Sequence, residues 1–205
     1  MPKRMHVNGT PPGWSYNPSS WPQRWPIIGL AGVGFLIAVY LALYQVRDQI
    51  PLVVSVWEPF FDSGSAVVLD SWVSKVLPVS DAALGAFGYL ADAITGAVGG
   101  RGRWRTMPWL VVLFGVFVGP LGGISVLLVI FQPVLFDSWC TLCLVTAAIS
   151  IVMIGPAMDE VLASLQHVRR TGREGHSRWR VFWGLGKTRS PQFSSIPRSA
   201  DVTGG

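Results

Sequence analysis

The chain has 205 residues, of which 50% are hydrophobic and only 13% are charged. Soluble domains average about 25% charged residues, so this composition argues against a soluble domain and favours a membrane protein with one compact bundle. The formal net charge of +5 is concentrated in particular segments, which indicates membrane topology rather than binding to nucleic acid.

Residues 1–25 are polar, rich in proline and basic, which is typical of a flexible N-terminal tail. We expect no cleavable signal peptide, because no apolar stretch precedes Pro26. The first predicted membrane span runs from Pro26 to Val46 and carries no charge. Tyr40 and Tyr44 share one face of this helix, where they fit interface anchors or, as an alternative, the lining of a ligand pocket.

Residues 47–80 form a long, largely acidic connection with more apolar side chains than a solvated linker needs. We expect a partly helical cap that packs onto the mouth of the bundle, because exposing such a patch is unfavourable. The alternative is a membrane-surface loop with aromatic anchors and no catalytic part. The apolar side chains that carry this prediction are Trp57, Phe60, Phe61, Val67, Val68 and Trp72.

Two further spans are predicted from Asp81 to Gly99 and from Met107 to Phe131. Asp92 lies inside the first of these, and an acid within a membrane span is a candidate functional residue by default. A structural ion pair with the basic loop 101–105 is the alternative. The other span should kink at Pro120, and Pro133 should break the helix into a tight turn over residues 132–137.

The fourth predicted span, Ser138 to Met158, contains both cysteines of the chain, Cys140 and Cys143. Asp137 or Ser138 is the expected N-cap. Residues three apart share a helical face, so a disulfide between the cysteines is feasible. The helix start favours a thiolate, and we expect Cys140 to be the more accessible sulfur.

The C-x-x-C spacing also occurs in other kinds of site. Two cysteines without a nearby histidine cannot complete a structural zinc site, and covalent haem attachment requires histidine where Leu144 stands. Two inert membrane cysteines remain an alternative.

Beyond Met158 an amphipathic helix should continue into a basic, mostly disordered tail, so residues 159–205 are predicted to form a C-terminal segment. Basic residues crowd both tails and the loop at 101–105, whereas the first connection is acidic. Cytoplasmic residues of membrane proteins are enriched in Lys and Arg, so both termini are predicted to be cytoplasmic. The cysteine pair and the first connection then meet on the outer, oxidising face.

Taken together, these features resemble the vitamin K epoxide reductase family of membrane oxidoreductases over about residues 26–158. The sequence FDSWCTLCLVTAAIS is the most specific part, and Gly64-Ser65 with Val67 to Ser71 also looks like the family's first loop. The resemblance implies an all-α membrane protein, a bundle of four transmembrane helices with a long outer loop capping it.

The resemblance also implies the site. The catalytic residues would be Cys140, Cys143 and Ser71, and the residues beside a quinone of the menaquinone or ubiquinone type would be Cys143, Ser71 and Trp139, with no metal. The partners implied are the lipid bilayer, the quinone and an extracytoplasmic, thioredoxin-like thiol protein, without nucleic acid. The expected location is a bacterial inner or cytoplasmic membrane.

One departure from the family pattern bears on function. Family members usually carry two further cysteines in the first loop, and this chain has none there; Ser65 stands about where the second would be. Two hypotheses follow. The first is a quinone-linked thiol oxidoreductase in which a partner thiol attacks Cys140 directly and Cys143 faces the quinone. The second is a membrane scaffold or assembly factor that retains the pair as a relic.

Overall fold

The structure is a computed structural model that describes residues 10–53, 55–61, 63–71 and 80–185. These residues form helices and no strand, which confirms the all-α prediction. In chain order the helices are α1 (Trp21–Gln45), α2 (Gly64–Leu69), α3 (Asp81–Ala97), α4 (Arg103–Thr106), α5 (Pro108–Phe136), α6 (Thr141–Arg173) and α7 (Arg178–Phe182).

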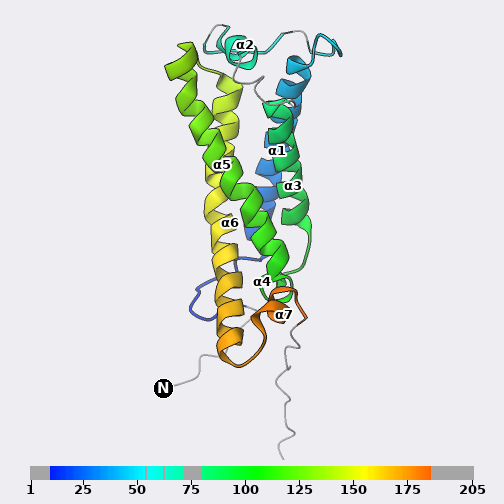
Figure 1. Cartoon of the computed structure of the whole chain (residues 1–205), viewed down its shortest axis with the longest axis vertical. Helices are drawn as coiled ribbons and strands as arrows, with labels where there is room; N and C mark the ends of the chain where they lie inside the picture. Colours follow the sequence, from blue (N-terminus) through cyan, green and yellow to red (C-terminus); the bar gives the residue numbers. More distant parts are fainter. Residues whose placement is uncertain (1–9, 54, 62, 72–79, 186–205) are drawn as a thin grey trace, which may run out of the picture.

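Three of the described helices, α1, α5 and α6, are long and apolar enough to cross a membrane, so the chain is an integral membrane protein. α3 runs beside α1, and α5 runs beside α6, while α2 lies across the upper end (Figure 1). With 17 residues, α3 is shorter than the roughly 20 that a helix needs to span the hydrocarbon core. A fourth membrane span at α3 therefore stays a prediction.

Small residues let the helices approach closely in the core. The aromatic ring of Tyr89 on α3 lies against the backbone of α1 at Gly34, and a Cβ added there would meet the ring carbons at 2.6–2.7 Å. Buried alanines, Ala31 and Ala38, flank this contact on α1. Small residues are typical of helix interfaces in membranes. Lipid removes the hydrophobic driving force between helices, so association depends on the van der Waals contact that small residues allow.

At the lower end, two buried arginines hold the carbonyl end of α3. Arg24 donates hydrogen bonds to the carbonyl oxygens of Gly96 and Gly99, and Arg103 forms a buried salt bridge with Glu160 on α6. The alternative that Asp92 pairs with the basic loop is wrong, because the buried guanidinium of that loop is committed to Glu160. Asp92 is 0% exposed, and neither carboxyl oxygen has a hydrogen-bond partner among the described residues.

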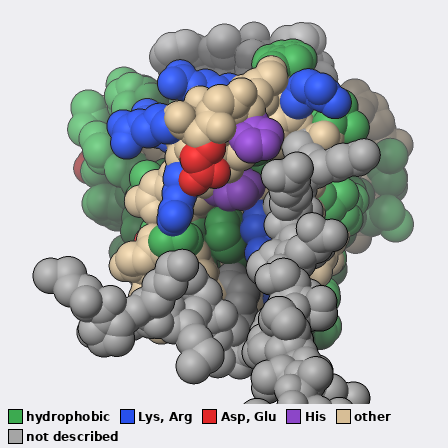
Figure 2. Space-filling model, turned by 90° about the horizontal axis from the view of Figure 1, so that it is seen from below, with side chains coloured by type: hydrophobic (Ala, Val, Ile, Leu, Met, Phe, Trp, Pro, Cys, Tyr) green, Lys and Arg blue, Asp and Glu red, His purple; other side chains and the backbone are tan. Residues whose placement is uncertain are grey.

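The first and last described segments, residues 10–20 and 178–185, both lie at this lower end (Figure 1). Residues 10–20 pack against it, with the Ser19 hydroxyl donating to Glu160 and the Asn17 amide donating to the carbonyl of Arg101. The amphipathic helix expected beyond Met158 is present, since α6 continues to Arg173. Basic side chains gather on this face (Figure 2). The division into tails and domain stays a prediction, and residues 1–9 and 186–205 lie outside the described residues.

At the upper end, the first connection is fastened to α1 by two tyrosines. Tyr44 donates to the Asp70 carboxylate at 3.2 Å, and Tyr40 donates to the carbonyl of Ser55 at 3.1 Å. Leu69 on α2 is buried with Leu41 and Tyr44. The tyrosines predicted as interface anchors therefore hold the connection in place.

The aromatic residues of this connection do not pack as predicted. Trp57 and Phe60 are 65% and 77% exposed. Residues 56–58 have neither helical nor turn structure, and side chains alternate along extended backbone. Val56 and Glu58 are accordingly half-buried while Trp57 points outward. Trp72 lies outside the described residues.

The turn before the cysteines also differs from the prediction. Pro133 does not end the helix, because α5 continues through it to Phe136. Proline removes one backbone hydrogen bond, a loss that membrane helices tolerate where local adjustments satisfy the freed group. The chain turns instead at Asp137, the only described residue other than glycine with positive φ, at 47°.

Candidate active site

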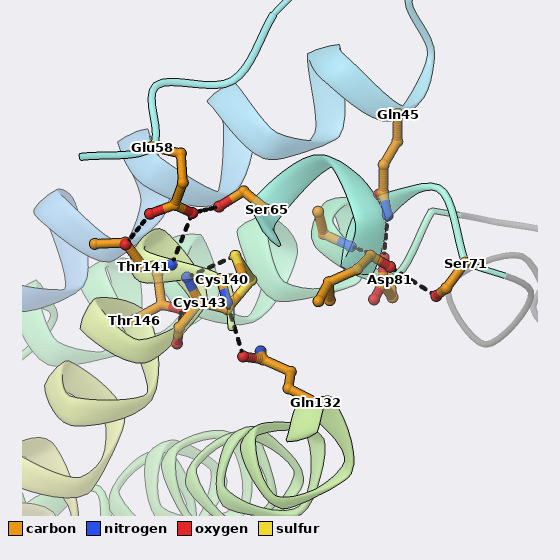
Figure 3. The surroundings of a disulfide bond; sticks show 12 residues. Gln45, Glu58, Ser65, Ser71, Asp81, Gln132, Cys140, Thr141, Cys143 and Thr146 are labelled. Atoms are coloured by element: carbon orange, nitrogen blue, oxygen red, sulfur yellow. Dashed lines mark hydrogen bonds between the residues drawn. A yellow bond between two sulfur atoms is a disulfide. The ribbon is translucent and has the colours of Figure 1, made fainter. Parts of the chain in front are cut away.

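The two cysteines form a disulfide at the start of α6. Cys140 has extended backbone angles as the N-cap residue, and Cys143 lies in the first turn, with 5.2 Å between their Cα atoms. The backbone N–H of Cys143 donates to Cys140 Sγ at 3.2 Å, and the N–H of Cys140 donates to Gln132 Oε1 at 3.0 Å (Figure 3). The helix start and the end of α5 thus hold the pair together.

The expected cap and the expected accessibility are both corrected. Neither Asp137 nor Ser138 is the N-cap of α6; the cap is Cys140, whose sulfur accepts the bond from the first turn. Cys140 is also not the accessible sulfur, because it is 0% exposed, whereas Cys143 is half-buried. The reason is that Cys140 is buried in a cluster with Leu69 of the first connection and with Leu41 and Tyr44 of α1.

Glu58 is the polar centre of the first connection where it covers the start of α6. Its carboxylate accepts hydrogen bonds from the hydroxyls of Ser65 and Thr141 and from the backbone N–H of Thr141, the last at 3.1 Å (Figure 3). Burial alone would raise the pKa of Glu58. The hydrogen bonds from Ser65, Thr141 and the backbone of Phe60 outweigh burial, so its pKa is held below its usual value of 4.5.

A cavity of about 470 Å³ lies among α1, α3, α5 and α6, below α2. Cys143 and Ser71 both line it, so the structure brings these two predicted residues to one space. Ser71 also donates a hydrogen bond to the carbonyl of Val68 at 2.6 Å. Most of the lining is apolar, and the polar members are Ser71, Asp81, Tyr89, Ser125, Gln132, Cys143 and Thr146.

Trp139 is placed differently from the other predicted site residues. It is 37% exposed, its ring centroid lies 6.4 Å from that of Phe61, and it does not line the cavity. Cys140 is also absent from the cavity lining, although its sulfur is bonded to Cys143. The disulfide therefore has one sulfur toward the cavity and one beneath the first connection.

A membrane bundle with a cystine at the edge of an apolar cavity defines a membrane protein equipped for thiol–disulfide chemistry. The chain belongs to the vitamin K epoxide reductase family, whose sequence model matches residues 25–157. This membership indicates an oxidoreductase of a family that is associated with quinones. No curated protein and no solved structure matches the chain.

The cavity fits the quinone that the family implies. Ligand pockets of about 300–1,000 Å³ with apolar walls and a few polar groups are typical of small-molecule sites, and this cavity has both properties. Among the described residues, no group of three or more His, Cys, Asp or Glu side chains could hold a metal ion.

Sequence reasoning missed three residues of the site: Glu58, Gln132 and Thr141. Gln132 is a polar residue at the end of an apolar span, eight positions before the cysteine whose N–H it accepts. A polar residue in that position could have been predicted as part of the site. Glu58 and Thr141 are 83 positions apart, and no spacing rule connects them.

Proposed function

We propose that this protein is a quinone-linked membrane thiol oxidoreductase whose Cys140–Cys143 disulfide oxidises the thiols of an extracytoplasmic, thioredoxin-like protein. The observation that carries the proposal is the position of the disulfide. Cys143 lines the apolar cavity that it shares with Ser71, while Cys140 does not line it and is buried in a cluster with Leu69 of the first connection. We therefore assign one sulfur to each reaction partner.

In the thiol reaction, a partner thiolate attacks Cys140 Sγ, the bond between the two sulfurs breaks, and Cys143 leaves as a thiolate. A second partner thiol then attacks the mixed disulfide and releases Cys140. The partner ends with a disulfide, and this chain ends with two thiols. The N–H of Cys143, which donates to Cys140 Sγ, stabilises negative charge on the released Cys140 sulfur.

The cavity residues bind and orient the second reactant. We assign the contacts to Cys143 and Ser71. The Ser71 hydroxyl, which donates to the Val68 carbonyl in the structure, would turn to donate a hydrogen bond to an oxygen of the bound group. When bound, a quinone of the menaquinone or ubiquinone type accepts two electrons and two protons and so restores the disulfide. The apolar walls exclude water from the Cys143 sulfur.

The topology belongs to the same proposal. With α3 as a fourth span, the arginine-rich lower end (Figure 2) is cytoplasmic by the positive-inside rule, and we infer that both termini are cytoplasmic as well. The first connection and the cysteine pair are then on the outer face of a bacterial inner or cytoplasmic membrane. This face is the oxidising side, where a disulfide persists.

The two cysteines should differ in a trapping experiment in membranes. Run in reverse with the partner in its disulfide form, the Cys140 thiolate of the Cys143→Ala variant attacks the partner disulfide and displaces one partner thiolate; with no Cys143 to displace the partner, this mixed disulfide should accumulate. The Cys140→Ala variant should not. The reverse pattern would show that the roles are exchanged. If neither variant traps a protein and the native pair labels identically with maleimide before and after reduction, the scaffold hypothesis is the better one.

A further inference from the structure

The end of the disulfide that the proposed thiol partner must reach is closed. Cys140 is 0% exposed, and its buried cluster includes Leu69 from the first connection, Leu41 and Tyr44 from α1, and Leu142 from α6. Cys143, in contrast, lines the cavity between the helices. A water-soluble thiol therefore meets a covered sulfur, and only the apolar side of the disulfide is open.

One contact brings the cover against the helix start, and a second contact lies within the cover. At Gly64, the first residue of α2, an added Cβ would collide with the carbonyl oxygen of Trp139, so only glycine allows this approach. Next to it, Ser65 is fully buried and donates its hydroxyl to Glu58. The chain has no cysteine in this connection, so hydrogen bonds and packing hold it beside Cys140.

Two hydrogen bonds join Glu58 to Thr141. Thr141 is the first residue of α6, and its N–H is one of the donors that a helix start leaves unpaired. A carboxylate at this position also gains from the positive end of the helix dipole. Bonds to an ionised acceptor are stronger than neutral ones. Glu58 therefore ties the cover directly to the residue that follows Cys140.

We propose that Glu58, Ser65 and Thr141 form a clasp that closes the first connection over Cys140, and that a water-soluble thiol or reductant reaches Cys140 only when the clasp opens. The identity of the thiol partner rests on the proposed function, but the clasp itself does not. Glu58 acts as a positioning residue, because it touches Thr141 and not the reacting sulfur. In a chain without cysteines in this connection, the clasp decides when the disulfide is exposed.

The test is the rate at which a charged, water-soluble phosphine reduces the disulfide of the detergent-solubilised protein. The phosphine takes up the oxygen of one water molecule and leaves two thiols, which maleimide labelling counts. Its charge keeps it out of the apolar cavity. We expect Glu58→Ala to be reduced at least about tenfold faster than the native protein, and Glu58→Gln to be intermediate, because an amide keeps one acceptor oxygen. Asp48→Asn removes an exposed acid of the same connection and should react at the native rate.

A second set of variants separates opening of the clasp from loss of the fold. Thr141→Val should also accelerate reduction, and the double variant Glu58→Ala with Thr141→Val should react no faster than Glu58→Ala alone, because both remove one interaction. If the substitutions only destabilised the fold, their accelerations of reduction would instead add in the double variant, and each variant would have a lower unfolding temperature. The clasp proposal is overturned if the native protein and Glu58→Ala are reduced at equal rates. It is also overturned if Asp48→Asn is accelerated as much as Glu58→Ala. Neither result depends on quinone, so the proposed function is tested separately.

Discussion

The hydroxyl of Tyr89 on α3 lies 2.7 Å from the hydroxyl of Ser150 and donates to the carbonyl of Thr146 at 2.6 Å, both on α6. Thr146 in turn donates to the carbonyl of Cys143 at 2.9 Å. This chain of contacts fixes the short helix α3 against the helix that carries the disulfide, along one wall of the cavity.

Replacing Tyr89 by Phe should lower the free energy of unfolding by about 1–2 kcal/mol, because the buried partners lose a hydrogen bond while the ring stays in place. Thermal and denaturant unfolding in detergent would measure the change. Tyr16→Phe removes an exposed bond to Asp159 and should cost less. Equal stability of Tyr89→Phe and the native protein would contradict the structural role given to this hydroxyl.

Replacing Ser71 by Ala should slow quinone-dependent reoxidation of the two thiols by about fivefold, the effect of one hydrogen bond of about 1 kcal/mol. The rate at which thiols reduce the disulfide should not change. Ser125→Ala is the matched control, since Ser125 also lines the cavity and, like Ser71, donates to a backbone carbonyl, but lies on α5 and is not assigned a contact with the quinone. Equal reoxidation rates for the Ser71 and Ser125 variants would remove Ser71 from the site.

Acid should open the cover over Cys140. The pKa of Glu58 is lower in the folded protein than its ordinary value of 4.5, so its hydrogen bonds stabilise the closed form fully above that value. This stabilisation is lost as pH falls below 4.5 through the folded pKa. Phosphine reduction of the native protein should therefore accelerate relative to Glu58→Ala below this pH. A constant ratio of the two rates between pH 7 and pH 3 would argue against the assignment.

The sequence predicted the elements whose signals are local. The charge-free apolar stretches give α1, α5 and α6, and the C-x-x-C spacing allows the disulfide that is present. The family resemblance added Ser71, which shares the cavity with Cys143. The exact helix ends were less predictable, because Pro133 is tolerated inside α5 and the turn falls at Asp137 instead.

The burial of Cys140 could not be read from its place in the chain. Nearness to the helix start suggests that Cys140 is exposed. Its actual exposure depends on the first connection, which is distant in the sequence and is bonded to the start of α6 through Glu58. The outward direction of Trp57 has a similar cause. Composition marks it as apolar, whereas the side to which it points follows from alternation along an extended segment that the sequence alone did not reveal.

The most direct test of the account is the stoichiometry of quinone reduction by the purified, reduced protein in lipid nanodiscs. A soluble quinone is added without any partner protein, its absorbance is followed, and the remaining thiols are counted with maleimide. The account predicts that one quinone is reduced for each pair of thiols lost, and that Cys143→Ala reduces none. Quinone reduction that persists in Cys143→Ala, or thiols that stay reduced in the native protein while the quinone is in excess, would contradict it.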